Sequence, residues 1–312
     1  MQSTPLEQFK SVYRREKYKL IGNHSAVKKC RWLHESLVNN RICYKQRFYG
    51  IQSHRCLQIT PSTFYCTLRC LHCWRLQPED LSLGPIFNTT IFPTADQPEL
   101  IVQESIKAQQ KILSGYNAHK NLDKSKYQEA LHPTHAAISL TGEPTLYPFL
   151  DRLISEFHKK KMTTFLVTNG TNPKALSKLN VEPTQLYVSL QAPDEKFFNR
   201  TCRPQISGAW QRIEESLEIL KSFKNPTVLR LTLAKNHNME KLDAYAKMIN
   251  KTQSTYVEAK AYMFLGYSRQ RLKFENMPMH HDIKYFSEKI SSLTGYNIKD
   301  DAPASRVVLL SK

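Results

Sequence analysis

Three cysteines within eight residues, Cys66, Cys70 and Cys73, constrain this chain more than any other feature. Their spacing, Cys-x3-Cys-x2-Cys, lets one irregular loop supply three thiolates to a cubic [4Fe-4S] cluster and leaves the fourth iron without a protein thiolate. Such a cluster can bind a small chelating molecule at that iron and do chemistry on it. A structural zinc site is the alternative, but it needs four ligands, and His72, adjacent to Cys73, is awkwardly placed to be the fourth.

The chain has seven cysteines in 312 residues, and six of them lie between positions 30 and 73. An odd count, with no apolar signal segment at the N-terminus, argues against a disulfide framework and favours metal ligation. Hydrophobic residues make up 40% of the sequence, and no stretch approaches the apolar length of a membrane span. We therefore expect a cytoplasmic protein with no membrane association.

Cys30, Cys43 and Cys56 form a second set, each thirteen positions after the last. Basic neighbours, among them Lys29 and Arg55, favour the thiolate forms that a metal requires. The set is therefore a candidate for a second three-cysteine cluster. Three unrelated buried cysteines are the alternative that the spacing leaves open.

The net charge is +18, and the segment between Lys10 and Gly50 carries eleven basic residues against two acidic ones. Such a basic segment indicates a polyanionic partner. Aromatic residues are interleaved with the basic ones, an arrangement that suits stacking on unpaired bases. They are Tyr13, Tyr18, Trp32, Tyr44, Phe48 and Tyr49. An ordinary solvated basic face is the alternative.

From about residue 55 onward, short runs rich in β-branched residues alternate with longer segments of helical period. This pattern is typical of repeated β/α units around a parallel sheet. Six strands are expected, at Arg55–Thr60, Ala136–Leu140, Thr163–Val167, Leu186–Leu190, Thr227–Leu233 and Tyr256–Leu265. Six units predict a partial (β/α)6 barrel, with its chemistry at the carboxyl ends of the strands.

Apolar stripes predict the helices outside this sheet. One stripe runs from Leu150 to Phe157 and another from Trp210 to Leu220, while Pro98–Ser114 is expected to form a helix capped by Gly115. We expect a basic extension over residues 1–54, which carries second-set cysteines, the barrel over residues 55–265, and an extension over residues 266–312 that packs on the barrel.

The loop Cys-x3-Cys-x2-Cys after the first strand of a β/α barrel resembles the radical S-adenosylmethionine superfamily. The resemblance implies that the open iron chelates S-adenosyl-L-methionine and that an electron from the cluster cleaves it to a 5′-deoxyadenosyl radical. Thr141-Gly142-Glu143-Pro144 resembles the Gly-Gly-Glu-Pro motif that holds the methionine amino group, with Thr141 in place of the first glycine. Positions that contact the adenosine or carboxylate are matched by Thr168, Asn169 and Ser189, although such residues often only cap helices.

The spacing of all six cysteines, thirteen, thirteen, ten, four and three positions, is similar to that of the tRNA 4-demethylwyosine synthase family. The segments 142–148, 267–269 and 276–278 extend the resemblance. It implies that N1-methylguanosine next to the anticodon of tRNA-Phe is joined to two carbons of pyruvate, with two [4Fe-4S] clusters present. Lys45 matches the family's lysine that is proposed to form a Schiff base with pyruvate. A phosphate-binding lysine is the alternative.

A methyl C–H on a ring nitrogen has no useful acidity, which explains why such chemistry needs a radical. The resemblance also implies a separate electron donor such as a flavodoxin or ferredoxin, and we expect a monomer. Arg75, Arg269 and Arg271 are candidates to contact tRNA phosphates, with surface solvation as the alternative. Two rival functions remain open: a two-cluster radical enzyme with another RNA base or metabolite as substrate, and a non-catalytic RNA-binding protein with structural zinc.

Overall fold

The computed structural model describes residues 4–81, 89–92 and 94–312. The chain forms two compact units. Unit 1 comprises Met1–Tyr65, Phe87–Val167 and Lys178–Thr184, and unit 2 comprises Cys66–Ile86, Thr168–Ser177 and Gln185–Lys312. Within the described residues, no helix combines the length and the apolar character that crossing a membrane would require.

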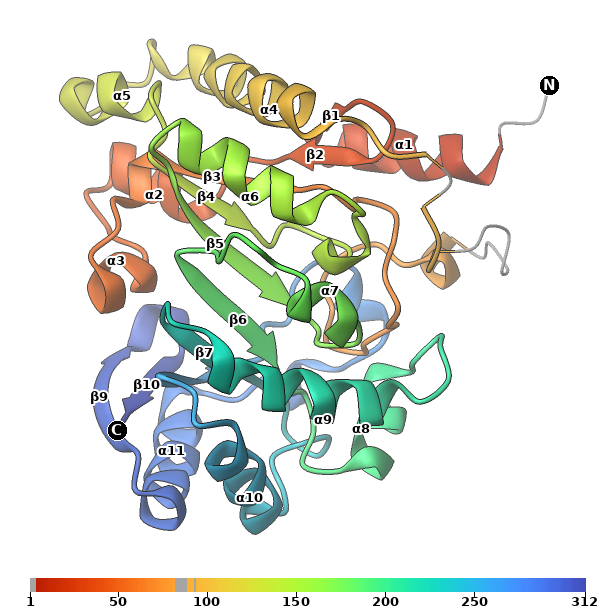
Figure 1. Cartoon of the computed structure of the whole chain (residues 1–312). Helices are drawn as coiled ribbons and strands as arrows, with labels where there is room; N and C mark the ends of the chain where they lie inside the picture. The colour runs from red at the N-terminus through yellow and green to blue at the C-terminus, as the bar shows by residue number, and fades with distance from the viewer. Residues whose placement is uncertain (1–3, 82–88, 93) are drawn as a thin grey trace. The chain divides into compact units, whose positions relative to one another are not determined.

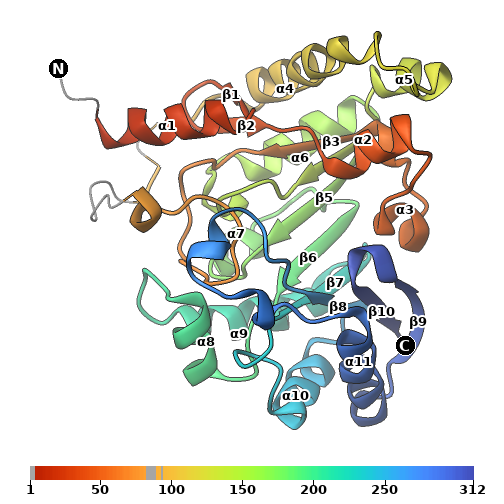
Figure 2. The same ribbon diagram turned by 180° about the vertical axis from the view of Figure 1, so that it is seen from behind.

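Unit 1 is built on five strands that are hydrogen-bonded in sequence order. They are β1 (Lys19–Ile21), β2 (Ser25–Val27), β3 (Cys56–Thr60), β4 (His135–Ile138) and β5 (Thr163–Thr168). The first two form an antiparallel hairpin, β2 is antiparallel to β3, and the pairs β3–β4 and β4–β5 are parallel. The hairpin follows α1 (Pro5–Arg15) in the chain and contacts α4 (Pro98–Leu113) (Figure 2).

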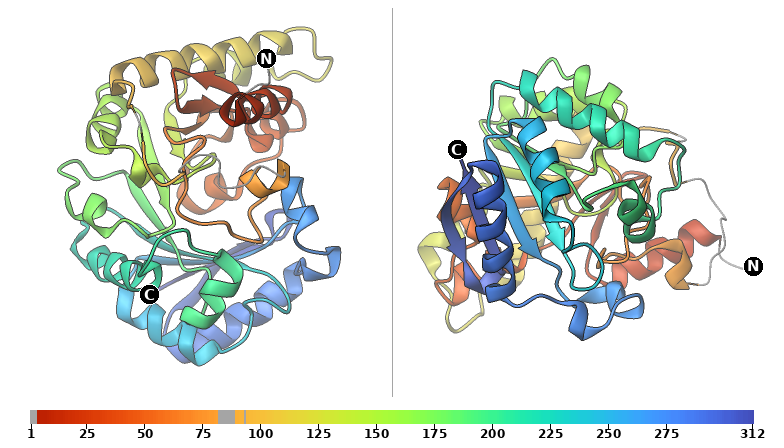
Figure 3. Two further views of the ribbon diagram at one scale, coloured as in Figure 1. Left: turned by 90° about the vertical axis from the view of Figure 1, so that its right-hand side faces the viewer. Right: turned by 90° about the horizontal axis from the view of Figure 1, so that it is seen from below.

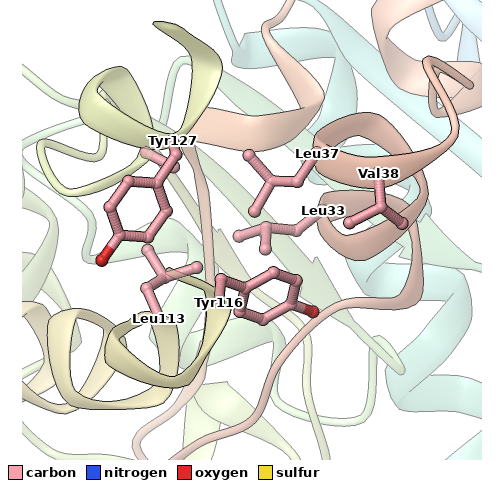
Figure 4. Close-up of a cluster of buried hydrophobic side chains, with 7 residues drawn as sticks. Leu33, Leu37, Val38, Leu113, Tyr116 and Tyr127 are labelled. Atoms are coloured by element: carbon pink, nitrogen blue, oxygen red, sulfur yellow. The ribbon is translucent and has the colours of Figure 1, made fainter. Parts of the chain in front are cut away.

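The other helices of unit 1 are α2 (Arg31–Val38), α3 (Tyr44–Tyr49), α5 (Lys124–Ala130) and α6 (Leu150–Lys159). The stripe predicted on α6 is fully buried, and α6 packs beside α4 (Figure 1). A small apolar core joins α2, the end of α4 and α5 (Figure 4). It contains Leu33 and Leu37 of α2 and Tyr127 of α5, and Cys30 packs against its edge.

Unit 2 has three parallel strands followed by an antiparallel pair. They are β6 (Gln185–Ser189), β7 (Thr227–Leu233), β8 (Tyr256–Ala261), β9 (Asn297–Ala302) and β10 (Val307–Ser311), hydrogen-bonded in the order β6-β7-β8-β10-β9. Its helices are α7 (Pro173–Ser177), α8 (Glu195–Cys202), α9 (Ala209–Ile219), α10 (Leu242–Thr252) and α11 (His280–Thr294). Helix α11 packs against β8 and β10 (Figure 3).

All six predicted strands are present, as β3 to β8, and the pairs within each unit are parallel as expected. Three details of the prediction are wrong. Strand β8 ends at Ala261 rather than Leu265, and Gly115 does not cap α4 because the chain continues into a 3-10 helix, Ser114–Tyr116. The two antiparallel hairpins, β1–β2 and β9–β10, were not predicted.

Candidate active site

The first cysteine set lies on an irregular loop of unit 2, and its three cysteines are partly exposed. The amide nitrogens of Arg69 and Leu71 donate to the carbonyls of Cys202 and Thr201, at the end of α8, both at 2.9 Å. These two bonds fix the backbone on either side of Cys70. The backbone nitrogen of Cys73 donates to the carbonyl of Cys70 at 3.1 Å, and burial together with Cys70 raises the pKa of the Cys73 thiol.

Cys202 is the seventh cysteine and the last residue of α8. It is completely buried, and a hydrogen bond between its side chain and that of Cys70, together with burial, raises the pKa of the Cys70 thiol. Among the described residues, no three His, Cys, Asp or Glu side chains are grouped to hold a single metal ion.

The turn after β5 contacts the same loop within unit 2. The Asn169 amide donates to Sγ of Cys66 at 3.8 Å and to Oγ1 of Thr67 at 2.9 Å. Its Oδ1 accepts from the Thr171 backbone nitrogen at 2.9 Å, which fixes the orientation of the amide. The hydroxyl of Thr168 instead accepts from the Gly170 nitrogen at 3.1 Å and closes the turn.

Ser189, also predicted as a site residue, is the buried last residue of β6. It stands in register with Arg230 of β7, which is in turn paired with Glu258 of β8. The Arg230 guanidinium makes two hydrogen bonds to the buried Glu258 carboxylate, at 3.0 and 2.8 Å. Ser189 therefore begins a row of polar side chains along one face of these strands.

The turn Thr141-Gly142-Glu143-Pro144 lies in unit 1, after β4. Gly142 has φ +69°, and a Cβ there would meet the Ser62 carbonyl oxygen at 1.8 Å and the Tyr65 carbonyl oxygen at 2.7 Å. The Glu143 nitrogen donates to that Tyr65 carbonyl at 2.8 Å. The turn therefore packs directly on the backbone that leads into Cys66, and only glycine fits at position 142.

Glu143 is 1% exposed, and one carboxylate oxygen accepts from the backbone nitrogen and the hydroxyl of Thr145, at 3.0 and 2.6 Å. These bonds hold the carboxylate in a fixed orientation. A buried, oriented carboxylate can accept hydrogen bonds from an ammonium group.

The second cysteine set and Lys45 lie together in unit 1. Burial raises the pKa of the Cys56 thiol, Cys30 and Cys43 raise it further, and the charge of Lys45 lowers it. Cys30, Cys43 and Lys45 therefore lie within electrostatic range of Cys56. Ligation of one cluster by these three cysteines stays a prediction.

Each of the three cysteines stands at the start of a helix or strand. Cys30 and Cys43 occupy the N-cap positions of α2 and α3, and Sγ of Cys43 accepts from the Lys45 nitrogen at 3.5 Å. The backbone nitrogen of Cys43 donates to Oγ of Ser53 at 2.8 Å, which ties α3 to the segment before β3. Cys56 is the first residue of that strand.

Lys45 is 8% exposed, and its ammonium nitrogen lies 4.6 Å from the centroid of the Phe165 ring. A lysine that contacted tRNA phosphates would lie in solvent, so burial argues against the phosphate-binding alternative. An amine on an apolar wall among thiols can instead act as a nucleophile.

Some expected nucleic-acid contacts are wrong. Tyr13 on α1, Tyr18 directly before β1 and Tyr44 on α3 are all buried. Arg75 is buried against the Trp74 ring, and Arg271 is directed into unit 2 toward Asp80, whereas Arg269 is exposed. Tertiary packing of aromatic rings outweighed the local pattern of basic and aromatic residues.

The parallel strands, the cysteine loop and the glycine turn define a radical S-adenosylmethionine enzyme. Residues 60–249 match the Radical SAM superfamily, and residues 251–312 match the family described as wyosine base formation. The chain belongs to the family of S-adenosyl-L-methionine-dependent tRNA 4-demethylwyosine synthases. The predicted α/β partial barrel is thereby confirmed, and the family implies S-adenosyl-L-methionine and one [4Fe-4S] cluster as cofactors.

Relatives of this family match the chain over nearly its whole length. The synthase of Pyrococcus abyssi is 49% identical over 98% of this chain and 89% of its own length, and that of Methanocaldococcus jannaschii is 38% identical over 97% and 96%. The Arabidopsis thaliana relative is 36% identical, but the chain spans only 45% of it. A solved structure of TYW1 with a lysine-pyruvate adduct bound superposes with a TM-score of 0.88, at 36% identity, over 98% of this chain and 95% of that one.

Proposed function

We propose that this enzyme condenses N1-methylguanosine, next to the anticodon of tRNA-Phe, with pyruvate to form 4-demethylwyosine. The observation that carries the proposal is the burial of Lys45, whose backbone nitrogen donates to the sulfur of Cys43 at 3.5 Å. A related solved structure holds a lysine-pyruvate adduct, and the family is named for this product. The rival function, a zinc-containing RNA-binding protein without catalysis, does not agree with membership of an enzyme family.

Cys66, Cys70 and Cys73 are the proposed ligands of the first cluster. The bound cluster and S-adenosyl-L-methionine supply a carbon radical strong enough to remove a hydrogen atom from a methyl group. Gly142 allows the backbone of its turn to approach the Ser62 and Tyr65 carbonyls closely. The Glu143 carboxylate accepts hydrogen bonds from the amino group of the methionine moiety. Asn169 orients the Cys66 thiolate through its amide, while Thr168 and Ser189 line the approach to the adenosine or carboxylate.

Lys45 is the proposed catalytic residue that holds pyruvate. Its amine adds to the keto carbon, and the resulting carbinolamine takes up a proton and loses water to give a protonated imine. Burial beside Phe165 keeps the amine out of bulk water, so the adduct forms away from solvent. The imine fixes the three-carbon substrate covalently, which replaces an encounter of two molecules by a reaction within one complex.

Cys30, Cys43 and Cys56 are the proposed ligands of a second [4Fe-4S] cluster. Three thiols and one neighbouring amine fit a cluster with one iron open to a bound substrate. The basic N-terminal segment offers exposed Arg14, Arg15, Lys17 and Lys19 for tRNA phosphates. Electrons are proposed to come from a separate flavodoxin or ferredoxin, and the enzyme is proposed to act as a cytoplasmic monomer.

Reduction with borohydride in the presence of labelled pyruvate tests the central step. We expect label on the native chain, none on Lys45→Ala, and undiminished label on Lys107→Ala, which alters a lysine that is 57% exposed on α4. Peptide mapping should place the label at Lys45. Equal labelling of the Lys45→Ala chain would refute the role of this residue.

The complete reaction is checked separately, with methylated tRNA-Phe, pyruvate, S-adenosyl-L-methionine and a chemical reductant under anaerobic conditions. The tricyclic base is identified by mass spectrometry of nucleosides. Formation of 5′-deoxyadenosine without any tricyclic base would instead favour a radical enzyme with another substrate.

A further inference from the structure

We propose that Arg271 is a positioning residue that holds the cysteine loop in its ligating shape before the first cluster binds. Arg271 lies in the segment that matches wyosine base formation, whereas Cys66, Cys70 and Cys73 lie in the segment that matches the radical SAM superfamily. The wyosine segment would therefore complete the cluster site. The inference rests on the ligation by these cysteines proposed above.

One guanidinium reaches several points of the loop at once. Nη2 of Arg271 donates to the carbonyl of Cys73 and, at 3.5 Å, to that of Arg75, while Nε donates to the carbonyl of Leu71 at 3.4 Å. Nη1 is paired with the carboxylate of Asp80. The side chains of this pair are 9% and 4% exposed, so water does not screen the contact strongly.

Asp80 extends the network to the other half of the loop. Its second oxygen accepts from the Gln77 backbone nitrogen at 2.7 Å, and the Gln77 amide donates to the Cys70 carbonyl at 2.9 Å. The Gln77 side-chain oxygen accepts from Arg203 at 3.0 Å, and Nε of Arg203 donates to the Arg69 carbonyl at 2.7 Å. We refer to Arg271, Asp80, Gln77 and Arg203 as the loop clamp.

The loop clamp satisfies carbonyls that no regular secondary structure could pair. An irregular loop has neither helix nor sheet to accept its hydrogen bonds, and unpaired buried carbonyls are costly. The positions of the thiols follow from the backbone between them. If the carbonyls turned toward water, the three sulfurs would lose the arrangement that one cluster requires.

A second observation places the wyosine segment tightly against the loop. Arg271 follows the 3-10 helix Gly266–Gln270, and the Tyr267 nitrogen donates to the Trp74 carbonyl at 3.1 Å. Gly266 has φ +54°, and a Cβ there would meet that carbonyl oxygen at 2.3 Å. The backbone at Gly266 thus approaches the backbone of Trp74 as closely as glycine permits. This contact places Arg271 beside the cysteine loop.

The positive charge of Arg271 predicts a second measurable effect, on the reduction potential of the first cluster. A cluster with three thiolates is negatively charged, and reduction makes it more so. A guanidinium held against the carbonyl of Cys73 stabilises the reduced form and raises the reduction potential. Loss of this charge lowers the potential, which a purely structural contact far from the cluster would not do.

The test uses the full chain with Arg271→Gln, Arg271→Lys and the matched control Arg269→Gln, which alters an exposed arginine two residues away. Hydrogen exchange of the amides of residues 66–80 is measured first on iron-free protein. We expect about tenfold faster exchange in Arg271→Gln than in the control, because a loop that has lost its clamp opens more often. Arg271→Lys keeps the positive charge but loses the planar guanidinium with its several N–H donors. Its loop should therefore exchange at a rate between those of Arg271→Gln and the control.

Iron release to a chelator is then measured on reconstituted protein, and we expect it to be about 10–100-fold faster in Arg271→Gln, as for other residues that orient metal ligands. The midpoint potential of the first cluster, read by electron paramagnetic resonance, should fall in Arg271→Gln and stay close to native in Arg271→Lys. If exchange, iron release and potential in Arg271→Gln all equal those of Arg269→Gln, the proposal is wrong.

Should Arg271→Gln not fold, Gln77→Ala removes the contact with the Cys70 carbonyl and leaves the Arg271–Asp80 pair in place. It should give the same direction of change in loop exchange and iron release, and unchanged values would overturn the loop clamp. The exchange measurement also separates two failures. If the native chain takes up no iron, the proposed ligation fails, while exchange in the iron-free chain still decides whether the clamp exists.

Discussion

The side-chain amide of Asn169 donates to the sulfur of Cys66 at 3.8 Å, so a turn after β5 touches a proposed cluster ligand directly. A hydrogen bond to a ligand sulfur withdraws electron density and stabilises the reduced cluster. We therefore expect Asn169→Ala to lower the midpoint potential of the first cluster, measured by an anaerobic redox titration.

Asn172→Ala is the matched control for this measurement. Asn172 lies three residues further along, where its Oδ1 accepts from the Ala175 nitrogen at 3.4 Å and caps the turn into α7. Its replacement should leave the potential unchanged. Equal potentials for Asn169→Ala and the native enzyme would show that the amide does not act on the cluster.

Gly142 and Gly50 provide a comparison between two glycines with nearly the same backbone angle. Gly142→Ala places a methyl group 1.8 Å from the Ser62 carbonyl oxygen, whereas Gly50→Ala, at φ +72°, meets no atom within 4 Å. The left-handed conformation alone costs about 1–2 kcal/mol for alanine. We expect Gly50→Ala to lose about that much unfolding free energy and Gly142→Ala to lose more than about 4 kcal/mol, measured by denaturant titration.

Binding of S-adenosyl-L-methionine adds a functional readout to the same pair. Gly50→Ala should bind it with native affinity, since Gly50 ends α3 and has no neighbour within 4 Å of the added methyl group. Gly142→Ala should bind it weakly or not at all. Native stability and native binding in Gly142→Ala would contradict the close packing of this turn.

The sequence predicts the parallel strands because short runs rich in apolar and β-branched residues alternate with segments of helical period. The β1–β2 hairpin escaped prediction because each strand has only three residues. The Gly22-Asn23 pair between the strands is a hairpin signal that could have found it. The β9–β10 pair was missed because the residues of β9 are mostly polar and exposed.

In the candidate active site, the sequence identifies those residues that belong to a motif of neighbouring positions. The spacing of the cysteines and the turn at Gly142 are such motifs. The role of Arg271 could not be predicted, because its partners Asp80 and Cys73 lie 191 and 198 positions away. Only the fold brings such residues together, and a lone arginine in the sequence resembles any solvated one.

A count of iron per chain tests the second cysteine set. Two cubic clusters require about eight irons per chain, and one requires about four. Cys43→Ser should lower the count from about eight to about four, because the hydroxyl keeps the capping bond from the Lys45 nitrogen but is a poor cluster ligand. Ser36→Ala, which alters a buried side chain of α2 that supplies no thiol, is the matched control, and we expect it to retain about eight irons. About four irons in both the native and Cys43→Ser chains would mean that the second set holds no cluster.

His24 makes the stability of the enzyme dependent on pH. The side chain is 1% exposed, the Asp96 backbone nitrogen donates to Nε2 at 2.8 Å, and Nδ1–H donates to the Pro61 carbonyl at 2.5 Å. Both ring nitrogens are thus satisfied in the neutral form. Burial lowers the pKa of His24 below its usual 6.5, although the Pro61 carbonyl and the Asp96 carboxylate oppose this shift.

The unfolded chain binds a proton at His24 more readily than the folded chain does. The free energy of unfolding is therefore highest above pH 6.5 and decreases as the pH falls below that value. One proton contributes at most about 1.4 kcal/mol per pH unit. His24→Gln, which has no titrating ring, should reduce the slope of unfolding free energy against pH between about 6.5 and 5, measured by denaturant titration at each pH. His281→Gln, at a side chain that is 80% exposed, should keep the native slope. The same slope in His24→Gln and His281→Gln would show that other buried histidines carry the acid sensitivity.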